Sequence, residues 1–278
     1  MKVITLPNSL NIFSTSPIQI FDYQSSKEIS KQRIILNQNT FSFLLEGTKE
    51  VLFDNSSLAI NHAKFLLMKS GHCLMTEKLS ETKNYRSLLF FFSNEALLAF
   101  VRKYDISRKD ASINQSIFAF EYDRFLNSFV RSLRDISKLP KSTMSTLIHL
   151  KFEEVLLYLI SVYGPDFLFS LLINSDSSSL QFKRTIEHNT LNKLTLKELA
   201  FLCNMSVSTF KRIFEKHYSE SPIKWFQQKR LKHARYLIQK EQKGPSEIYN
   251  EIGYESLSSF IQAYKAAFGV TPKQHRQY

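Results

Sequence analysis

The last third of the chain carries one short pattern twice, with matching positions 49 to 50 residues apart. Each copy has a short apolar helical stripe, then a turn residue that tolerates a positive φ angle, then a longer stripe with two aromatic residues four positions apart. Asn204 and Gly253 stand at the two turns. The aromatic pairs are Phe210 with Phe214 and Phe260 with Tyr264. The repeat predicts an all-α domain made of two helix-turn-helix units.

The first copy has clear helix-start signals. Thr195 followed by Glu198 is a capping-box pattern, and Ser206 offers an N-cap oxygen directly after the turn at Asn204. The apolar face of its first helix is Leu196, Leu199 and Ala200. Between the copies, Ser221 and Pro222 have the N-cap and first-turn pattern of a helix that extends to about Lys240 and acts as a rigid spacer.

The second helix of each copy leaves polar and cationic side chains on its outward face. Such a helix fits the major groove, where its exposed N-terminal side chains meet base edges and its cations meet phosphates. The expected base contacts are Ser208, Lys211, Arg212, Ser258, Ser259 and Gln262, and the expected phosphate contacts are Thr209, Lys216 and Lys265. A helical hairpin with a solvated basic face is the alternative for one copy, but the repeat favours double-stranded DNA.

With these motifs in place, the segment from Thr195 to Arg276 resembles the DNA-binding domain of AraC/XylS-type bacterial transcription regulators. The matching residues are Leu199-Ala200, Ser206, Phe210, Arg212, Phe214, Ser221-Pro222, Arg230-Leu231, Ala234, Ile252-Gly253-Tyr254, Phe260, Lys265, Phe268-Gly269, Thr271-Pro272 and Arg276. The resemblance implies sequence-specific regulation of transcription, with RNA polymerase as a plausible partner of an activator.

Two positions depart from the family pattern, and both lie in the second unit. Tyr249 stands where a small Ala is usual, which predicts local repacking, and Gln262 stands where Arg is usual. An amide has fewer donors than a guanidinium and is better suited to adenine. The second unit is therefore expected to read DNA more weakly than the first.

The charge distribution agrees with a polyanion partner. From residue 179 to 278 the chain has 17 Lys and Arg against 8 Asp and Glu, while the remainder has 20 against 17. A basic excess confined to one domain favours nucleic acid, although an anionic membrane surface or simple solubility would also account for it.

The cysteines and the N-terminus indicate a reducing, cytoplasmic location. The chain has two cysteines, Cys73 and Cys203, without metal-ligand spacing. The apolar run at the N-terminus is too short for a signal peptide, and no uncharged stretch approaches a membrane span. We expect no disulfide, no zinc module and no membrane partner.

From about Ile18 to Phe92 the chain has short β-rich runs separated by turn residues such as Gly47 and Gly71. The expected strands are 33–36, 41–45, 50–53, 64–68 and 87–92. Before a regulator-like domain, this block looks like the cupin-type sensory barrel of many AraC-family members. The fold class predicted for the whole chain is therefore α+β, a cupin-like β-barrel with following helices and then the two-unit helical domain.

Many cupins are metal-dependent enzymes, so a cupin-fold metalloenzyme fused to a DNA-binding domain is the competing function. A facial metal site needs two or three His and a carboxylate on one face. His62 and His72 stand alone, and only His72 with Glu77 suggests such a site. We expect no catalysis and no cofactor. An aromatic-lined interior offers room for a small effector, but neither that molecule nor a regulatory protein partner can be named from the sequence.

Two long amphipathic helices follow the strands. One buries Leu126 and Leu133, and the other, from about Ser142 to Tyr163, carries an apolar stripe made of Ile148, Phe152, Val155, Leu159 and Val162. The stripe either packs on the barrel or pairs two copies, and we expect a homodimer. The polar run 174–179 predicts the linker between a sensory and dimerisation domain, 1–173, and a DNA-binding domain, 180–278.

Overall fold

The computed structural model describes residues 2–10, 16–108, 115–172 and 178–276. Its internal contacts divide the chain into two units, residues 1–181 and 182–278. Of the expected linker, positions 174–177 lie outside the described residues. None of the helices in the described ranges is both long enough and apolar enough to span a bilayer.

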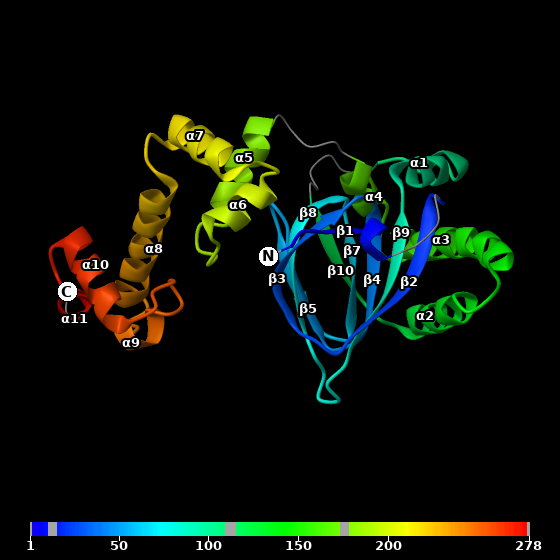
Figure 1. The fold of residues 1–278 in the computed structure, drawn as a ribbon, viewed down its shortest axis with the longest axis horizontal. Helices are drawn as coiled ribbons and strands as arrows, with labels where there is room; N and C mark the ends of the chain where they lie inside the picture. Colours follow the sequence, from blue (N-terminus) through cyan, green and yellow to red (C-terminus); the bar gives the residue numbers. More distant parts are fainter. Residues whose placement is uncertain (1, 11–15, 109–114, 173–177, 277–278) are drawn as a thin grey trace. The chain divides into compact units, whose positions relative to one another are not determined.

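In its described residues, the N-terminal unit is built on ten strands in two five-stranded sheets (Figure 1). One sheet, here called sheet A, has the order β1-β3-β8-β5-β6, and sheet B has the order β10-β7-β4-β9-β2. The strands are β1 (Ile4–Leu6), β2 (Ile18–Ser25), β3 (Ile29–Leu36), β4 (Asn39–Glu46), β5 (Thr48–Leu52), β6 (Ser57–Ile60), β7 (Lys64–Met68), β8 (Gly71–Lys78), β9 (Tyr85–Phe92) and β10 (Ile117–Glu121). The cupin-like α+β architecture is confirmed, with two facing sheets in place of a closed barrel.

Sheet B is the middle layer of this unit, and its sequence shows it. Along β9, Leu88, Phe90 and Phe92 belong to the core under the helices, while Leu89 and Phe91 belong to the core between the sheets. Because side chains alternate between the two faces of a strand, a strand covered on both sides reads as a continuous apolar run. The run 87–92 is therefore a central strand.

Among the described residues, four helices follow or interrupt the strands of this unit. They are α1 (Asn94–Lys103), α2 (Arg124–Ile136), α3 (Lys141–Tyr163) and α4 (Asp166–Leu172), after a short 3-10 turn, η1 (Asn8–Leu10). Residues of all four helices share the core on the outer face of sheet B. Phe152 of α3, for example, lies 5.1 Å from the Phe92 ring, measured between ring centroids.

This packing corrects the expected dimer stripe. Ile148, Phe152, Val155 and Leu159 are each at most 3% exposed and belong to the chain's own core, so they are not available to a second copy. Val162 alone of the five is open to solvent, with 52% of its surface exposed. The physical reason is that sheet B presents a row of Phe side chains on its outer face, and an apolar helical stripe covers that row at no cost in association entropy.

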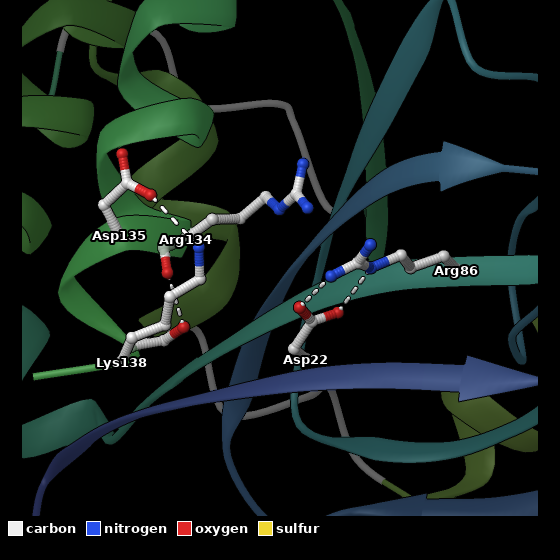
Figure 2. Close-up of polar contacts among 6 residues, drawn as sticks. Asp22, Arg86, Arg134, Asp135 and Lys138 are labelled. Atoms are coloured by element: carbon white, nitrogen blue, oxygen red, sulfur yellow. Dashed lines mark hydrogen bonds and ion pairs between the residues drawn. The ribbon is translucent and has the colours of Figure 1, made fainter.

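A bidentate ion pair connects β9 and β2, the neighbouring strands at one edge of sheet B. Arg86 of β9 donates from Nε and Nη2 to the Asp22 carboxylate of β2, at 2.9 and 2.6 Å (Figure 2). The hydrogen bonds from Arg86 lower the pKa of Asp22, and the Arg134 charge adds to the effect. Just beyond the end of α2, Lys138 pairs with Asp135 of that helix in an exposed position.

The second unit is entirely helical in its described residues. It comprises most of α5 (Ser178–His188), then α6 (Leu196–Leu202), α7 (Val207–Tyr218), α8 (Pro222–Gln239), α9 (Pro245–Ile248), α10 (Leu257–Phe268) and α11 (Pro272–His275). Helix α8 runs between α6 and α7 on one side and the three last helices on the other (Figure 1). Its Pro222 occupies the first turn as expected, although the Ser221 side chain forms no capping hydrogen bond.

Candidate nucleic-acid interface

The first helix-turn-helix unit has the caps that its sequence predicts. The Thr195 hydroxyl accepts from the Glu198 backbone N–H at 3.3 Å, while the Glu198 carboxylate accepts from the Thr195 backbone N–H at 2.7 Å. Asn204 has a φ of 53°, and the Ser206 hydroxyl then accepts from the Thr209 N–H at 3.1 Å. Together these bonds fix the angle at which α7 leaves α6.

Helix α7 turns one face inward and leaves the other to solvent. Phe210 and Phe214 are completely buried, and both rings lie within 6.4 Å of the Phe182 ring from α5. The predicted side chains Ser208, Lys211, Arg212 and Lys216 are all exposed. A rigid aromatic core thus holds a polar, cationic ridge of helical width on the surface.

The second unit repeats this construction. The Gly244 backbone N–H donates to the Glu247 carboxylate at the start of α9, Gly253 takes a φ of 88° at the turn, and Ser256 caps α10 through the Ser259 N–H. Phe260 and Tyr264 are buried as their counterparts in α7 are, and Ser258, Ser259, Gln262 and Lys265 are exposed. Tyr249 is half-buried against the local core, which is where its bulk is absorbed.

Several of the predicted contacts also form hydrogen bonds within the protein, and Thr209 and Ser259 are two examples. The Thr209 side chain is half-buried, and its hydroxyl accepts a hydrogen bond from Ser206 at 2.9 Å. The Ser259 hydroxyl donates to the Ser256 carbonyl oxygen at 2.9 Å. Both side chains therefore stabilise the N-terminus of a recognition helix in addition to any contact with DNA.

The cations on these helices point to solvent. In the part of the chain that the structure describes, Lys211, Arg212, Lys216 and Lys265 form no ion pair, although Lys224 of α8 pairs with Glu220 at 3.0 Å. Solvated Lys and Arg on a helix that projects from a basic domain are suited to phosphate groups.

The sequence did not predict a set of contacts between the two helix-turn-helix units. Lys193, in the loop before α6, donates to Asn250 of the second turn, and Arg230 of α8 donates to the Asn192 carbonyl oxygen. In the sequence, Arg230 was noted only because it matches the family pattern. No neighbouring residue indicates a role for Lys193, since its partner is 57 residues away. Only the three-dimensional arrangement brings these residues together.

The N-terminal unit, residues 1–181, contains a separate cavity between its two sheets. Its volume is about 330 Å³, and apolar side chains such as Leu36 and Met75 line it together with Lys49 and Glu77. The Lys49 Nζ lies 3.3 Å from Glu77 Oε1, and both side chains are almost completely buried. A cavity of this size suits a small molecule.

The histidines do not assemble a metal site around this cavity. His72 and Glu77 are five residues apart on the regular strand β8 and so lie on opposite faces, and Glu77 is paired with Lys49. Within the described ranges, no group of three or more His, Cys, Asp and Glu side chains is placed to hold a metal ion.

Comparisons with known proteins agree with this arrangement. Residues 39–170 match the ExsA N-terminal regulatory domain family, and residues 199–278 match a helix-turn-helix domain family. The regulator ExsA of Pseudomonas aeruginosa is 28% identical over 240 residues, which cover 84% of each chain. The virulence regulon transcriptional activator VirF of Yersinia enterocolitica is 31% identical over 171 residues, 61% of this chain and 62% of that protein. Among solved structures, ToxT from Vibrio cholerae aligns over 94% of this chain and 98% of its own at 14% identity, with a TM-score of 0.40.

Two helix-turn-helix units behind an N-terminal regulatory domain define a DNA-binding transcription regulator. These matches support a place for the chain among regulators of the AraC/XylS family. Both relatives are described as regulators of transcription.

Proposed function

We propose that the chain binds two adjacent major-groove segments of promoter DNA and that α7 is its principal reader. The observation that carries this proposal is the matched register of α7 and α10, each with a buried aromatic pair on one face and exposed polar side chains on the other. Arg212 offers a planar fork of donors where the second unit offers the Gln262 amide, which supports a stronger first contact.

The regulation of transcription follows from this binding. The relative VirF is described as a transcriptional activator, which supports the same sign of regulation for this chain. RNA polymerase is then the protein partner at the promoter, and the cytoplasm is the compartment in which both meet the chromosome.

The regulatory signal acts on the N-terminal unit, residues 1–181. The cavity between the sheets supports a small-molecule effector. Its walls are mostly apolar, and they also include the buried Lys49–Glu77 ion pair. A buried ion pair costs free energy unless polar groups compensate it, so a polar group on the effector would be favourable there. A regulatory protein that binds this unit is the second candidate for the signal.

Dimerisation is proposed through the outer face of α3. Leu150 and Leu157 are two helical turns apart on one side of the helix and are 59% and 39% exposed. Apolar side chains aligned in this way on a long helix favour pairing with a second copy of the chain. Such a dimer would also place two DNA-binding domains, one from each copy, on one promoter.

Mapping the bound DNA across a bacterial genome, followed by selection from random duplexes with the full chain, tests the proposal. The expected result is a recurrent two-segment motif upstream of transcription units. Binding without a shared motif would overturn it.

A further inference from the structure

The two helix-turn-helix units have separate apolar cores. In the first, Phe214 packs with Phe210 and with Phe226 from the first half of α8. In the second, Leu231 and later residues of α8 pack with Phe260 and Tyr264. Between the two units lies a cleft of about 470 Å³, lined on one side by Thr195 and Leu196 and on the other by Gly253 and Tyr254. Their relative orientation therefore depends on α8 and on whatever bridges the cleft.

Among the described residues, the polar contacts that bridge it include the following three. Lys193 Nζ donates to Asn250 Oδ1 at 3.0 Å, which connects the loop before α6 directly to the second turn. Arg230 Nη2 donates to the Asn192 carbonyl oxygen at 3.1 Å. Near the same place, Gln227 of α8 donates to the Tyr254 hydroxyl at 3.4 Å.

Arg230 also lies against the second turn. A Cβ atom built on Gly253 would be 3.0 Å from Arg230 Nη1 and 3.7 Å from Lys193 Cγ. The guanidinium thus fills the space that a side chain at position 253 would need. The Arg230 side chain is half-buried, and burial lowers its pKa, so the contact is made at a cost in hydration.

We infer that Lys193, Arg230, Asn250 and Gly253 form a strut that sets the register between the two recognition helices, and so determines the spacing of the two DNA segments that the chain accepts. This rests on the proposed two-segment binding. One extra base pair moves a segment by about 3.4 Å along the duplex and turns it by about 35°. A rigid strut makes that displacement costly, whereas a bare helix tolerates some twist. The four residues are positioning residues that need no contact with DNA.

The test uses the full chain and a duplex obtained by selection with the unmodified protein. Three probes are compared: the selected duplex, the same duplex with one base pair inserted between its segments, and the same duplex with the second segment scrambled. Asn250→Ala is the central variant because it breaks the strut without changing charge. Lys193→Ala removes the other partner, and Lys232→Ala removes one positive charge from the exposed face of α8 as the matched control.

Asn250→Ala and Lys193→Ala are expected to weaken binding to the selected duplex by about threefold to tenfold, a typical coupling for a contacting pair. The inserted base pair should cost the variants less than it costs the unmodified chain. Binding to the scrambled duplex should stay within about twofold for Asn250→Ala, and the double variant should be no weaker than the weaker single variant. Lys232→Ala should keep the full insertion penalty.

Two results overturn the strut. One is an insertion penalty that is the same in Asn250→Ala as in the unmodified chain, and the other is an equal loss on all three probes, which indicates general destabilisation. If the unmodified chain binds the selected and scrambled duplexes equally, the two-segment proposal itself fails, which is a distinct outcome.

Discussion

Lys193 and Asn250 meet at 3.0 Å although 57 residues separate them, and the backbone of Gly253 lies beside that contact. Glycine is required at position 253 for two reasons. Its φ of 88° belongs to the left-handed region, and an added Cβ would press on the guanidinium of Arg230. Gly269 shares the first reason, with a φ of 77°, but an added Cβ there would meet no atom within 4 Å.

Gly253→Ala and Gly269→Ala are therefore predicted to differ in function and not in stability. Each should lower the free energy of unfolding by about 1 kcal/mol through backbone strain, since the far end of Arg230 is flexible enough to move away. Gly253→Ala alone should weaken binding to two-segment DNA. Thermal melting and DNA titration of both variants check this. A selective loss of stability in Gly253→Ala with unchanged DNA binding would contradict it.

Base reading and phosphate contact are predicted to separate by substitution on α7 and α10. Arg212→Ala should cost on the order of 1–3 kcal/mol and relax the preference at one or two base pairs, because a fork of donors to a base edge is lost. Lys265→Ala should weaken binding to all sequences alike, and Gln262→Ala should do less than Arg212→Ala. Binding-site selection with each variant measures this. If Gln262→Ala reshapes the motif and Arg212→Ala leaves it intact, the second unit is the principal reader.

The helical unit was readable from sequence because its signals are local. The capping box at Thr195, the turn at Asn204 and the aromatic spacing from Phe210 each lie within a few residues, and the repeat supplied a second copy for comparison. Burial of both aromatic pairs then follows from the 3.6-residue period.

The sequence could not decide which surface each apolar stripe covers. The expected strands at 33–36, 41–45, 50–53, 64–68 and 87–92 are all present. The sequence did not single out β1, β2, β6, β8 or β10, and β1 pairs with β3 in parallel. Helix α3 has apolar side chains on opposite faces, so Leu159 and Leu157 look alike in sequence. Their burial, 0% against 39% exposed, is decided by the sheet to which the helix packs. The contacts of the strut, such as Lys193 with Asn250, could not be predicted either, because the two residues are 57 positions apart in the sequence.

Dimer disruption is expected from the exposed face of α3. Leu150→Glu with Leu157→Glu should shift the monomer–dimer equilibrium toward monomer, because charges would be buried at an apolar contact. Leu98→Glu, at a side chain 40% exposed on α1, is the matched control and should leave the mass unchanged. Sedimentation equilibrium of the full chain measures all three. Leu159→Glu should instead unfold the first unit, and an unchanged dimer in the α3 double variant would place the interface elsewhere.

The Asp22–Arg86 pair predicts a pH dependence of stability. Because Arg86 lowers the pKa of Asp22 in the folded state, the pair stabilises the fold above the ordinary carboxyl pKa of about 4, and this stabilisation is lost as the pH falls through the lowered value. Asp22→Asn should lower the free energy of unfolding by about 1 kcal/mol at neutral pH, with the difference closing in acid. Glu121→Gln, which breaks the more exposed pair with Lys64, is the control and should have little effect. Denaturant melts at pH 7 and below pH 4 compare them. An Asp22→Asn effect that persists in acid would contradict the ion-pair origin.

The segment from about Ser179 to Tyr278 is predicted to fold alone and to bind duplex DNA with a steep dependence on salt. Its units carry their own cores, and its 17 Lys and Arg exceed its 8 Asp and Glu. Each phosphate neutralised by a cation adds about 0.9 to the slope of log affinity against log salt, because a condensed counterion is released. Contacts from Lys216 and Lys265 alone would give a slope near 2, and Lys216→Ala should reduce the slope by about 1. Titrations of a labelled duplex at several salt concentrations measure the slope, with Glu215→Ala as the control that removes a neighbouring charge of opposite sign. A flat salt response in a folded segment would rule out binding through the phosphate backbone, and with it the assignment of these lysines.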